Sequence, residues 1–204
     1  MGLKQLAKET AVYGLSSIVG RFLNWMLVPM YTRVFTDTGD FGIVTNLYGW
    51  TALLLVILTY GMETGFFRFI NKKEEQEPMR VYSTVLASLA VTSALFFVLV
   101  MLLLQPICQG IGYTEHPEYV AMMAGIVAVD AFCCIPFAYL RYKGLAWNFA
   151  GIRLFNIFLN IALNIFLLVV CPRIYASHPG WIDWFYVPDY GVGYVFAANV
   201  VTTA

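Results

Sequence analysis

Three ionisable side chains lie inside otherwise apolar stretches of this sequence: Arg21, Glu63 and Asp130. A charge placed in hydrocarbon is costly, so such groups usually face a cavity or pair with a partner. An arginine presents a planar fork of donors that fits phosphate or carboxylate oxygens. A carboxylic acid in a poorly solvated site can exchange a proton or bind Na+. The sequence thus offers one group suited to an anion and two acids suited to coupling with an ion.

The arginine belongs to a polar face of its stretch. That face consists of Gly14, Ser17, Arg21 and Asn24. Spacings of three and four residues place these positions on one side of a helix. Arg21 and Asp130 both fall near mid-depth if their stretches cross a membrane, whereas Glu63 lies nearer one surface. The first two therefore either form an internal salt bridge that fixes helix packing or line a polar central cavity.

A second polar stripe consists of asparagines. Asn156, Asn160 and Asn164 recur every four residues, so they share one helical face. Inside a membrane, such amides either hydrogen-bond to neighbouring helices or line a water-filled path. The sequence leaves both alternatives open.

Proline and glycine interrupt the same stretches. Pro29 and Pro136 predict bends, because proline has no N–H to donate and crowds the preceding turn. Gly61 and Gly65 form a GxxxG pattern around Glu63, which predicts a close approach to another backbone at that acid.

The composition places the chain in a membrane. Of its 204 residues, 60% are apolar and only 12% are charged, whereas about 25% are charged in an average soluble domain. Twelve basic residues cancel twelve acidic ones, so no basic field is available to hold nucleic acid. The four cysteines lie in or beside apolar runs without CxxC spacing, which indicates small buried apolar side chains.

Several apolar stretches are long enough to cross a bilayer as helices, which takes about 20 residues. Five of them are complete, at residues 11–34, 41–67, 81–107, 119–140 and 152–170. A sixth begins at Gly191 and is cut off at Ala204, which predicts a piece of a longer protein. The predicted fold class is an all-α integral membrane protein, a polytopic helix bundle.

Lysine and arginine are distributed unevenly between the loops. With the N-terminus inside the cell, the inner side carries nine of them, and the outer side carries only Arg33 and Arg173. Because cytoplasmic loops are enriched in these residues, the N-terminus is predicted to be cytoplasmic. The segment 141–153 mixes cations with large apolar residues, and we predict that it lies along the inner membrane surface before the fifth span.

Motifs of catalysis are absent from the sequence. It has no nucleotide-binding loop, zinc-protease motif or serine-nucleophile motif, and His116 and His178 stand alone in predicted outer loops. We therefore predict a protein that is not an enzyme, with no cofactor and no metal site.

Four segments carry a resemblance to a known family. They are LAKETAVYGLSSIVGRFLNWMLVPMYTRVF, GDFGIVTNLYGW, YGMETGFFRF and VDAFCCIPFAYLRYKGLAWNFAGIRLFNIFLNIALNIFLLVVCP. Together they resemble the N-terminal half of bacterial polysaccharide flippases, the O-antigen and capsule exporters, which are similar in fold to multidrug and toxic compound extrusion (MATE) transporters. The resemblance implies two six-helix lobes that rock around a central cavity. Residues 1–204 would be the N-terminal lobe, truncated in its sixth helix, with the C-terminal lobe absent.

The resemblance also implies a function in the bacterial inner membrane. Related proteins move undecaprenyl-diphosphate-linked oligosaccharide from the inner to the outer leaflet, drawing on an H+ or Na+ gradient. Arg21, with Ser17 and Asn24, would then contact the diphosphate, and the asparagine stripe would contact sugar hydroxyls. Asp130 or Glu63 would couple to the ion. Membrane lipids and polysaccharide polymerase or assembly proteins are the implied partners.

Two other functions remain as alternatives. A multidrug exporter of the same fold would bind organic cations, against which a mid-membrane Arg21 argues. A membrane scaffold subunit that transports nothing would use its buried charges only to pair with one another.

Overall fold

The computed structural model describes residues 3–35, 38–71, 78–178, 180 and 182–203, and their side chains except those of residues 3–9, 17, 21, 24, 38 and 189. Every regular element in these ranges is a helix. The long helices are α1 (Leu3–Trp25), α3 (Thr38–Thr59), α5 (Pro78–Leu102), α7 (Pro117–Tyr142) and α8 (Ala146–Ile165). The shorter helices are α2 (Leu27–Val34), α4 (Met62–Ile70), α6 (Leu104–Ile111), α9 (Cys171–Ser177) and α10 (Val192–Thr203). A π-helical turn, η1 (Phe166–Val170), joins α8 to α9, and a 3₁₀ turn, η3 (Pro188–Tyr190), precedes α10.

The predicted all-helical membrane class is confirmed. Within the described ranges, four helical stretches are long and apolar enough to cross a bilayer: Gly39–Ile70, Pro78–Leu102, Pro117–Tyr142 and Ala146–Ser177. Two further apolar helices, Thr10–Gly20 within α1 and Val192–Thr203, are shorter. A fifth complete span, a truncated sixth and the likeness to one exporter lobe remain predictions.

The long helices expose large apolar side chains. Val56, Val91 and Leu102 have exposed fractions of 72%, 67% and 77%. Apolar surface in water is unfavourable, whereas lipid chains solvate it as well as another helix would. These faces of the bundle therefore suit contact with acyl chains.

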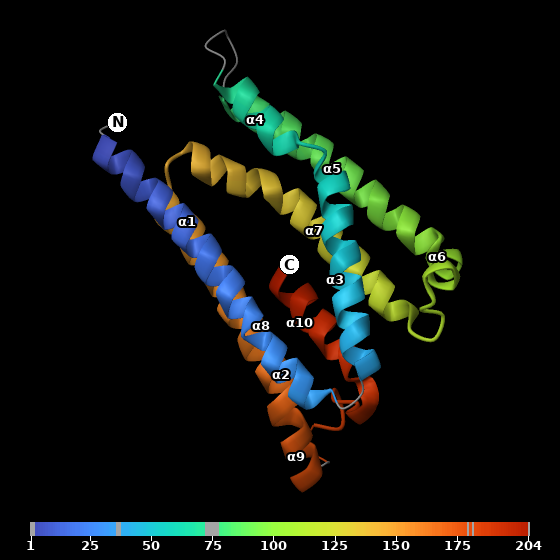
Figure 1. Cartoon of the computed structure of the whole chain (residues 1–204). Coiled ribbons are helices and arrows are strands. Elements are labelled where there is room, and N and C mark those ends of the chain that lie inside the picture. Colours follow the sequence, from blue (N-terminus) through green and yellow to red (C-terminus); the bar gives the residue numbers. More distant parts are fainter. Residues whose placement is uncertain (1–2, 36–37, 72–77, 179, 181, 204) are drawn as a thin grey trace.

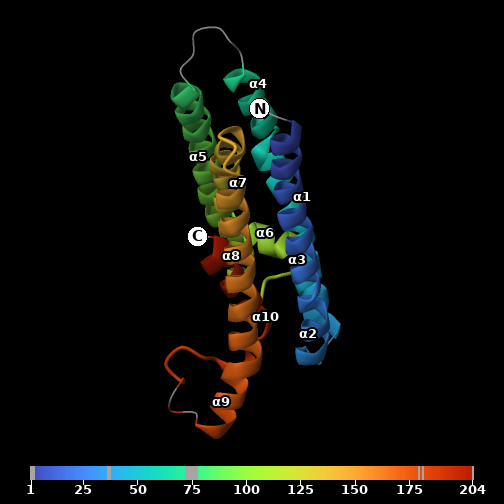
Figure 2. The same ribbon diagram turned by 90° about the vertical axis from the view of Figure 1, so that its left-hand side faces the viewer.

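The helices run up and down the long axis of the molecule (Figure 1). α1 and α8 lie side by side and run in the same direction, while α7 packs against α3, α5 and α10. The start of α1, the end of α4 and the α7–α8 turn lie at one end, and the end of α2 and α9 lie at the other (Figure 2). We call these the α7–α8 end and the α9 end. The start of α1, the end of α4 and the α7–α8 turn belong to the predicted inner side, and the end of α2 and α9 belong to the predicted outer side, so each end of the molecule gathers segments predicted for one side.

Two apolar clusters hold the bundle together. The larger joins α3, α7 and α10 through Leu47, Val120 and Phe196, which are at most 1% exposed. The smaller joins α4 to α5 and α7, with Phe66 and Leu89 fully buried. Both clusters include residues of α7, so this helix is central to the packing.

The first helix is interrupted just before Pro29, but the bend predicted there is small. α1 ends at Trp25 and α2 begins at Leu27, because the ring nitrogen of Pro29 cannot donate to the carbonyl four residues earlier. α2 continues nearly in line with α1, so the interruption causes little change of direction (Figure 1). Pro136 lies inside α7 without ending it.

The close approach predicted from the GxxxG pattern is wrong. A Cβ atom at Gly61 or Gly65 would meet no atom within 4 Å, so no other described backbone packs there. Gly61 instead precedes α4 with a φ of 72°, a left-handed conformation that glycine adopts without steric cost. It lets the chain change direction between α3 and α4 (Figure 1).

The segment 141–153 also differs from its prediction. Instead of lying apart from the spans, it forms the end of α7, a turn of three residues and the start of α8. Gly144 adopts a φ of 69°, and its N–H donates to the carbonyl of Arg141. This left-handed glycine ends α7, and the short turn places the cations of the segment on two packed helices.

Candidate functional site

The asparagine stripe of α8 is at the centre of a buried hydrogen-bond network. Asn160 and Asn164 are 8% and 0% exposed. The Asn164 amide nitrogen donates to the Asn160 backbone oxygen at 2.9 Å and to its side-chain oxygen at 3.0 Å. The Tyr31 hydroxyl of α2 donates to the Asn164 side-chain oxygen at 3.0 Å. The stripe therefore links α8 to the helix that follows α1.

The same network continues into α10 and α3. The Asn160 amide nitrogen donates to the Asn199 side-chain oxygen at 2.8 Å and to the Thr202 hydroxyl at 3.1 Å. The Asn199 amide donates in turn to the Tyr48 hydroxyl of α3. Two alternatives were open for the stripe, and Asn160 and Asn164 take the first: they hydrogen-bond to neighbouring helices. Asn156 is half-buried and makes no hydrogen bond to the described residues.

Glu63 forms an ion pair near the α7–α8 end. One of its carboxylate oxygens lies 2.5 Å from a guanidinium nitrogen of Arg141, and both side chains are about one third exposed. The Cys134 thiol lies 3.8 Å from the other oxygen and can donate to it. The acid of α4 is thereby tied to α7 rather than left as an isolated charge.

Two guanidinium groups lie around one aromatic ring at the same end. Arg141 of α7 and Arg153 of α8 lie 5.6 Å and 5.4 Å from the centre of the Phe149 ring. Arg141 also lies over Phe67, and Arg153 over Phe137. An aromatic face attracts a cation through its quadrupole, so the rings hold two like charges close together. Arg141 is already paired with Glu63, so Arg153 is the member of the two that has no ion pair with a described residue and can attract an anion.

Asp130 lies on α7 and is partly buried. Arg153 is near enough for its charge to act on this carboxylate, but the two form no ion pair, and Asp130 has no hydrogen-bond partner among the described side chains. The acid thus lies within the electrostatic influence of the arginines without being neutralised by direct contact.

The side chains of Ser17, Arg21 and Asn24 lie outside the described residues, so the salt bridge between Arg21 and Asp130 stays a prediction. Their helix positions are nevertheless given. On α1, Tyr13 packs its ring against Phe149, and a Cβ at Gly20 would lie 2.7 Å from Ile157, so these positions face α8.

The polar face of α1 flanks this contact with α8. At 3.6 residues per turn, Arg21 is rotated about 100° from Gly20 around the helix. The apolar side chains of Leu15, Ile18 and Phe22 are 64%, 66% and 57% exposed and lie on the far side of the helix. The positions of Ser17, Arg21 and Asn24 therefore fall between the packed side and the exposed apolar side.

Comparison with protein families identifies the chain. Residues 6–132 match the family described as polysaccharide biosynthesis protein, which is more than half of the sequence. The chain belongs to the polysaccharide biosynthesis protein family. No curated protein and no solved structure matches it.

The match to the polysaccharide biosynthesis family runs from α1 to the first part of α7. It therefore includes Arg21, Glu63 and Asp130, the three ionisable residues that the sequence indicates. Arg141, Arg153 and the asparagines of the network lie beyond the matched residues, whereas its tyrosines, Tyr31 and Tyr48, lie within them. The resemblance to the polysaccharide exporters inferred from the sequence is confirmed at the level of this family.

The arginine pair is the feature that sequence reasoning missed, because both residues were counted as loop charges. A local signal was present for one of the contacts: Phe149 precedes Arg153 by four residues, and residues four apart share a helix face. The other contacts join residues that are not four apart, and the equal spacing of Phe137 and Arg141 corresponds to no contact between those two side chains. The pairing of Arg141 with Glu63 has no such signal, since the two residues lie on helices far apart in the sequence.

The asparagine network predicts a difference between two neighbouring substitutions. Asn164→Leu removes the partner of Tyr31 and leaves buried polar atoms unpaired, so it should lower the free energy of unfolding by about 1–2 kcal/mol. Asn156→Leu removes no described hydrogen bond and should change it by less than about 0.5 kcal/mol. Unfolding of both variants in the same detergent, followed by circular dichroism, measures the difference. Equal losses in the two variants would contradict the role of the network.

Proposed function

We propose that this chain is the N-terminal lobe of a flippase. The substrate would be undecaprenyl-diphosphate-linked oligosaccharide, moved from the inner to the outer leaflet of the bacterial inner membrane by alternating access. The observation that carries the proposal is the match of residues 6–132 to the polysaccharide biosynthesis protein family. The matched residues include helices that are long and apolar enough to cross a membrane. A lipid-linked sugar made on one side of a membrane needs such a carrier, because its charged diphosphate cannot cross hydrocarbon unaided.

The substrate class is supported by the charges of the bundle. Arg21 lies on the polar face of α1, and Arg141 and Arg153 are held around Phe149. A diphosphate offers oxygens that guanidinium groups bind in a fork-like geometry. In an exporter of organic cations, we would expect acidic side chains without arginines close to them. In the proposed cycle, Arg21 with Ser17 and Asn24 contacts the diphosphate, and the exposed Arg153, beside the ion-paired Arg141, attracts it at the α7–α8 end.

The ion-coupling part of the proposal concerns Asp130 and Glu63. Asp130 is partly buried without a direct ionic partner among the described residues, which favours exchange of H+ or Na+ over a fixed structural pair. Glu63 is paired with Arg141, so its release would require that pair to open. Of the two acids, Asp130 is the better candidate for ion coupling.

Loss of Arg21 tests the diphosphate contact. In the full-length protein, Arg21→Ala should lower export of lipid-linked oligosaccharide by about 10- to 100-fold, the loss expected for a charge-assisted contact. Arg21→Lys should restore it only in part, because an ammonium group lacks the planar fork. Export is measured as labelled glycan reaching the outer leaflet. Arg33→Ala, an exposed cation on α2, is the matched control and should leave export unchanged.

A second variant separates the contact from a structural pair. If Arg21→Ala loses activity and Arg21→Ala with Asp130→Ala regains it, the two residues form a salt bridge and the substrate role fails. No recovery in the double variant is expected.

Substitution of the acids tests the coupling. Asp130→Asn should abolish the dependence of export on the pH gradient or the Na+ gradient, because an amide cannot bind and release a proton or carry the charge that holds Na+. The single variants Glu63→Gln and Arg141→Gln should each lower the free energy of unfolding, because each breaks the same ion pair. Both should leave the gradient dependence of export intact. Gradient-driven export in proteoliposomes measures both effects. Unchanged gradient dependence in Asp130→Asn would make that acid merely structural.

The orientation of the bundle is tested by cysteine labelling. We propose that the α7–α8 end is cytoplasmic, because the basic residues concentrate there. In a variant without native cysteines, Trp184→Cys at the α9 end should react with an impermeant maleimide in intact cells. Lys143→Cys should react only after the inner membrane is opened. Both positions are exposed in the structure, so labelling of position 143 from outside would invert the proposed topology.

A further inference from the structure

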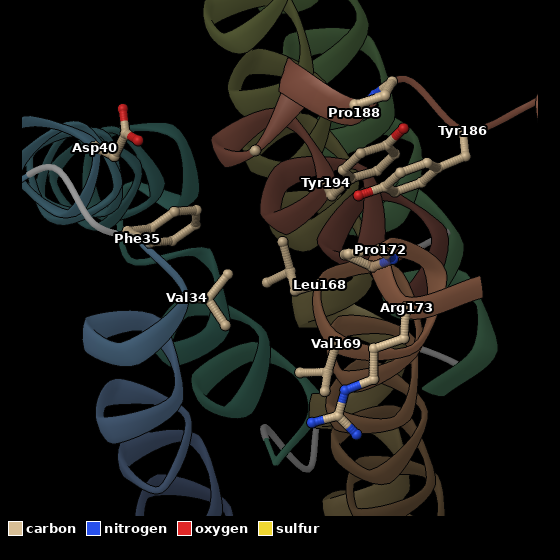
Figure 3. A pocket seen from close by; sticks show the side chains of 11 residues that line it. Val34, Phe35, Asp40, Leu168, Val169, Pro172, Arg173, Tyr186, Pro188 and Tyr194 are labelled. Atoms are coloured by element: carbon tan, nitrogen blue, oxygen red, sulfur yellow. The ribbon is translucent and has the colours of Figure 1, made fainter. Parts of the chain in front are cut away.

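A cavity of about 530 Å³ lies at the α9 end, away from the arginine pair. One wall comes from the end of α2 and the start of α3, and the other from η1, α9 and the start of α10 (Figure 3). Pockets of about 300–1,000 Å³ are the usual size for small-molecule sites. The cavity is therefore large enough for a ligand of the size of one or two sugar rings.

Two opposite charges line the cavity from different walls. Asp40 lies in the first turn of α3, and Arg173 lies in α9. Figure 3 shows them on opposite sides of the space. Neither forms an ion pair with a described residue, so both retain their capacity to bind a ligand. A carboxylate only accepts hydrogen bonds and a guanidinium only donates them, so the cavity offers both kinds of partner.

Stacked tyrosines form part of the same wall as Arg173. The rings of Tyr186 and Tyr194 lie 5.2 Å apart and nearly parallel, at 6°. The Tyr194 hydroxyl accepts from the Val187 N–H at 2.6 Å, which fixes the chain between the two rings. Both tyrosines are buried to more than nine tenths. The aromatic wall is thus formed before any ligand arrives.

The backbone of this wall departs from the α-helical pattern. Leu168 and Val169 of the π-helical turn line the cavity, and so does Pro172, two residues after the end of that turn. Proline cannot donate the N–H that would continue the α-helical bonds of the preceding turn, which explains why the helix widens there. Such π-helical turns occur often at functional sites.

We propose that this cavity binds a sugar unit carrying a negatively charged substituent. Arg173 would hold the carboxylate or phosphate of the sugar, Asp40 would accept hydrogen bonds from its hydroxyl groups, and the tyrosine wall would cover the flat face of the ring. The placement of the site on the path of the glycan rests on the proposed flippase function. The binding chemistry itself rests only on the residues of the cavity. The site lies at the α9 end, whereas Arg21, which is proposed to hold the diphosphate, is expected near mid-depth on α1, so one substrate molecule would have two separate contacts.

Direct binding tests the proposal without any transport step. The full chain is placed in nanodiscs of phosphatidylcholine, and saturation-transfer NMR measures binding of methyl glucuronide, methyl glucoside and glycerol phosphate. Methyl glucuronide should bind about tenfold more tightly than methyl glucoside, since one charge-assisted contact distinguishes them. Glycerol phosphate, which represents a lipid headgroup, should bind more weakly than methyl glucuronide because it lacks the ring.

Variants of the cavity complete the experiment. Arg173→Ala should raise the Kd of methyl glucuronide by about tenfold or more and remove the preference over methyl glucoside. Asp40→Asn should weaken both sugars. Arg33→Ala, an exposed cation at the same end that does not line the cavity, should change neither. Retained circular dichroism spectra show that the variants are folded.

The inference is overturned by absence of sugar binding to the unaltered chain, by equal binding to Arg173→Ala, or by tighter binding of glycerol phosphate. Export by the full-length protein is scored separately. If the chain binds the sugar but the full-length protein exports nothing, the flippase proposal fails and the sugar site stands. If no sugar binds and Arg173→Ala leaves export unchanged, the sugar site alone fails.

Discussion

Hydrocarbon offers no partner to an amide, and this constraint organises the middle of the bundle. An unpaired polar group there costs several kcal/mol, so Asn160 and Asn164 must find donors and acceptors on other helices. They find them on α2 and α10, and Asn199 extends the connection to α3. This requirement constrains the relative placement of these four helices, together with the apolar cluster that packs between them. Tyr194 of α10 and Arg153 of α8 lie on helices that the network joins, whereas Arg141 lies on α7.

The polar groups of the molecule are arranged along its length in three different ways. At the α7–α8 end, rings hold cations that remain partly accessible. In the middle, amides satisfy one another and are closed to solvent. At the α9 end, opposite charges line an open space without pairing. A carrier of a lipid-linked glycan, the proposed function, would need contacts of different character for the lipid linker and for the sugars, and these three arrangements lie at separate depths of the bundle.

Much of the fold could be predicted from the sequence, because its cause is local. Runs of apolar residues set the spans, and Pro29 set the interruption between α1 and α2. Glycine was less informative: the pair at Gly61 and Gly65 fits a packing motif, but only the backbone conformation of Gly61 shows that it serves a change of direction. The spacing of the asparagines predicted that they share one helix face. Only the tertiary structure shows that Asn160 and Asn164 hydrogen-bond to neighbouring helices instead of lining a water-filled path. The pair of Glu63 with Arg141 and the cavity of Asp40 with Arg173 depend on helices brought together from distant parts of the chain, which no spacing rule encodes.

The left-handed residue between α3 and α4 has a consequence for the thickness of membrane that this chain can occupy. The stretch Gly39–Ile70 contains 32 residues and would be about 48 Å long as one straight helix, well beyond a hydrocarbon core of about 30 Å. A straight helix of that length would have to tilt steeply or thicken the surrounding lipid. Because the chain turns at Gly61, α4 can lean away from the direction of α3 (Figure 1). The excess length is then taken up at the turn formed by Tyr60 and Gly61, which both have positive φ, so α3 need not tilt as steeply as a straight helix of 32 residues would.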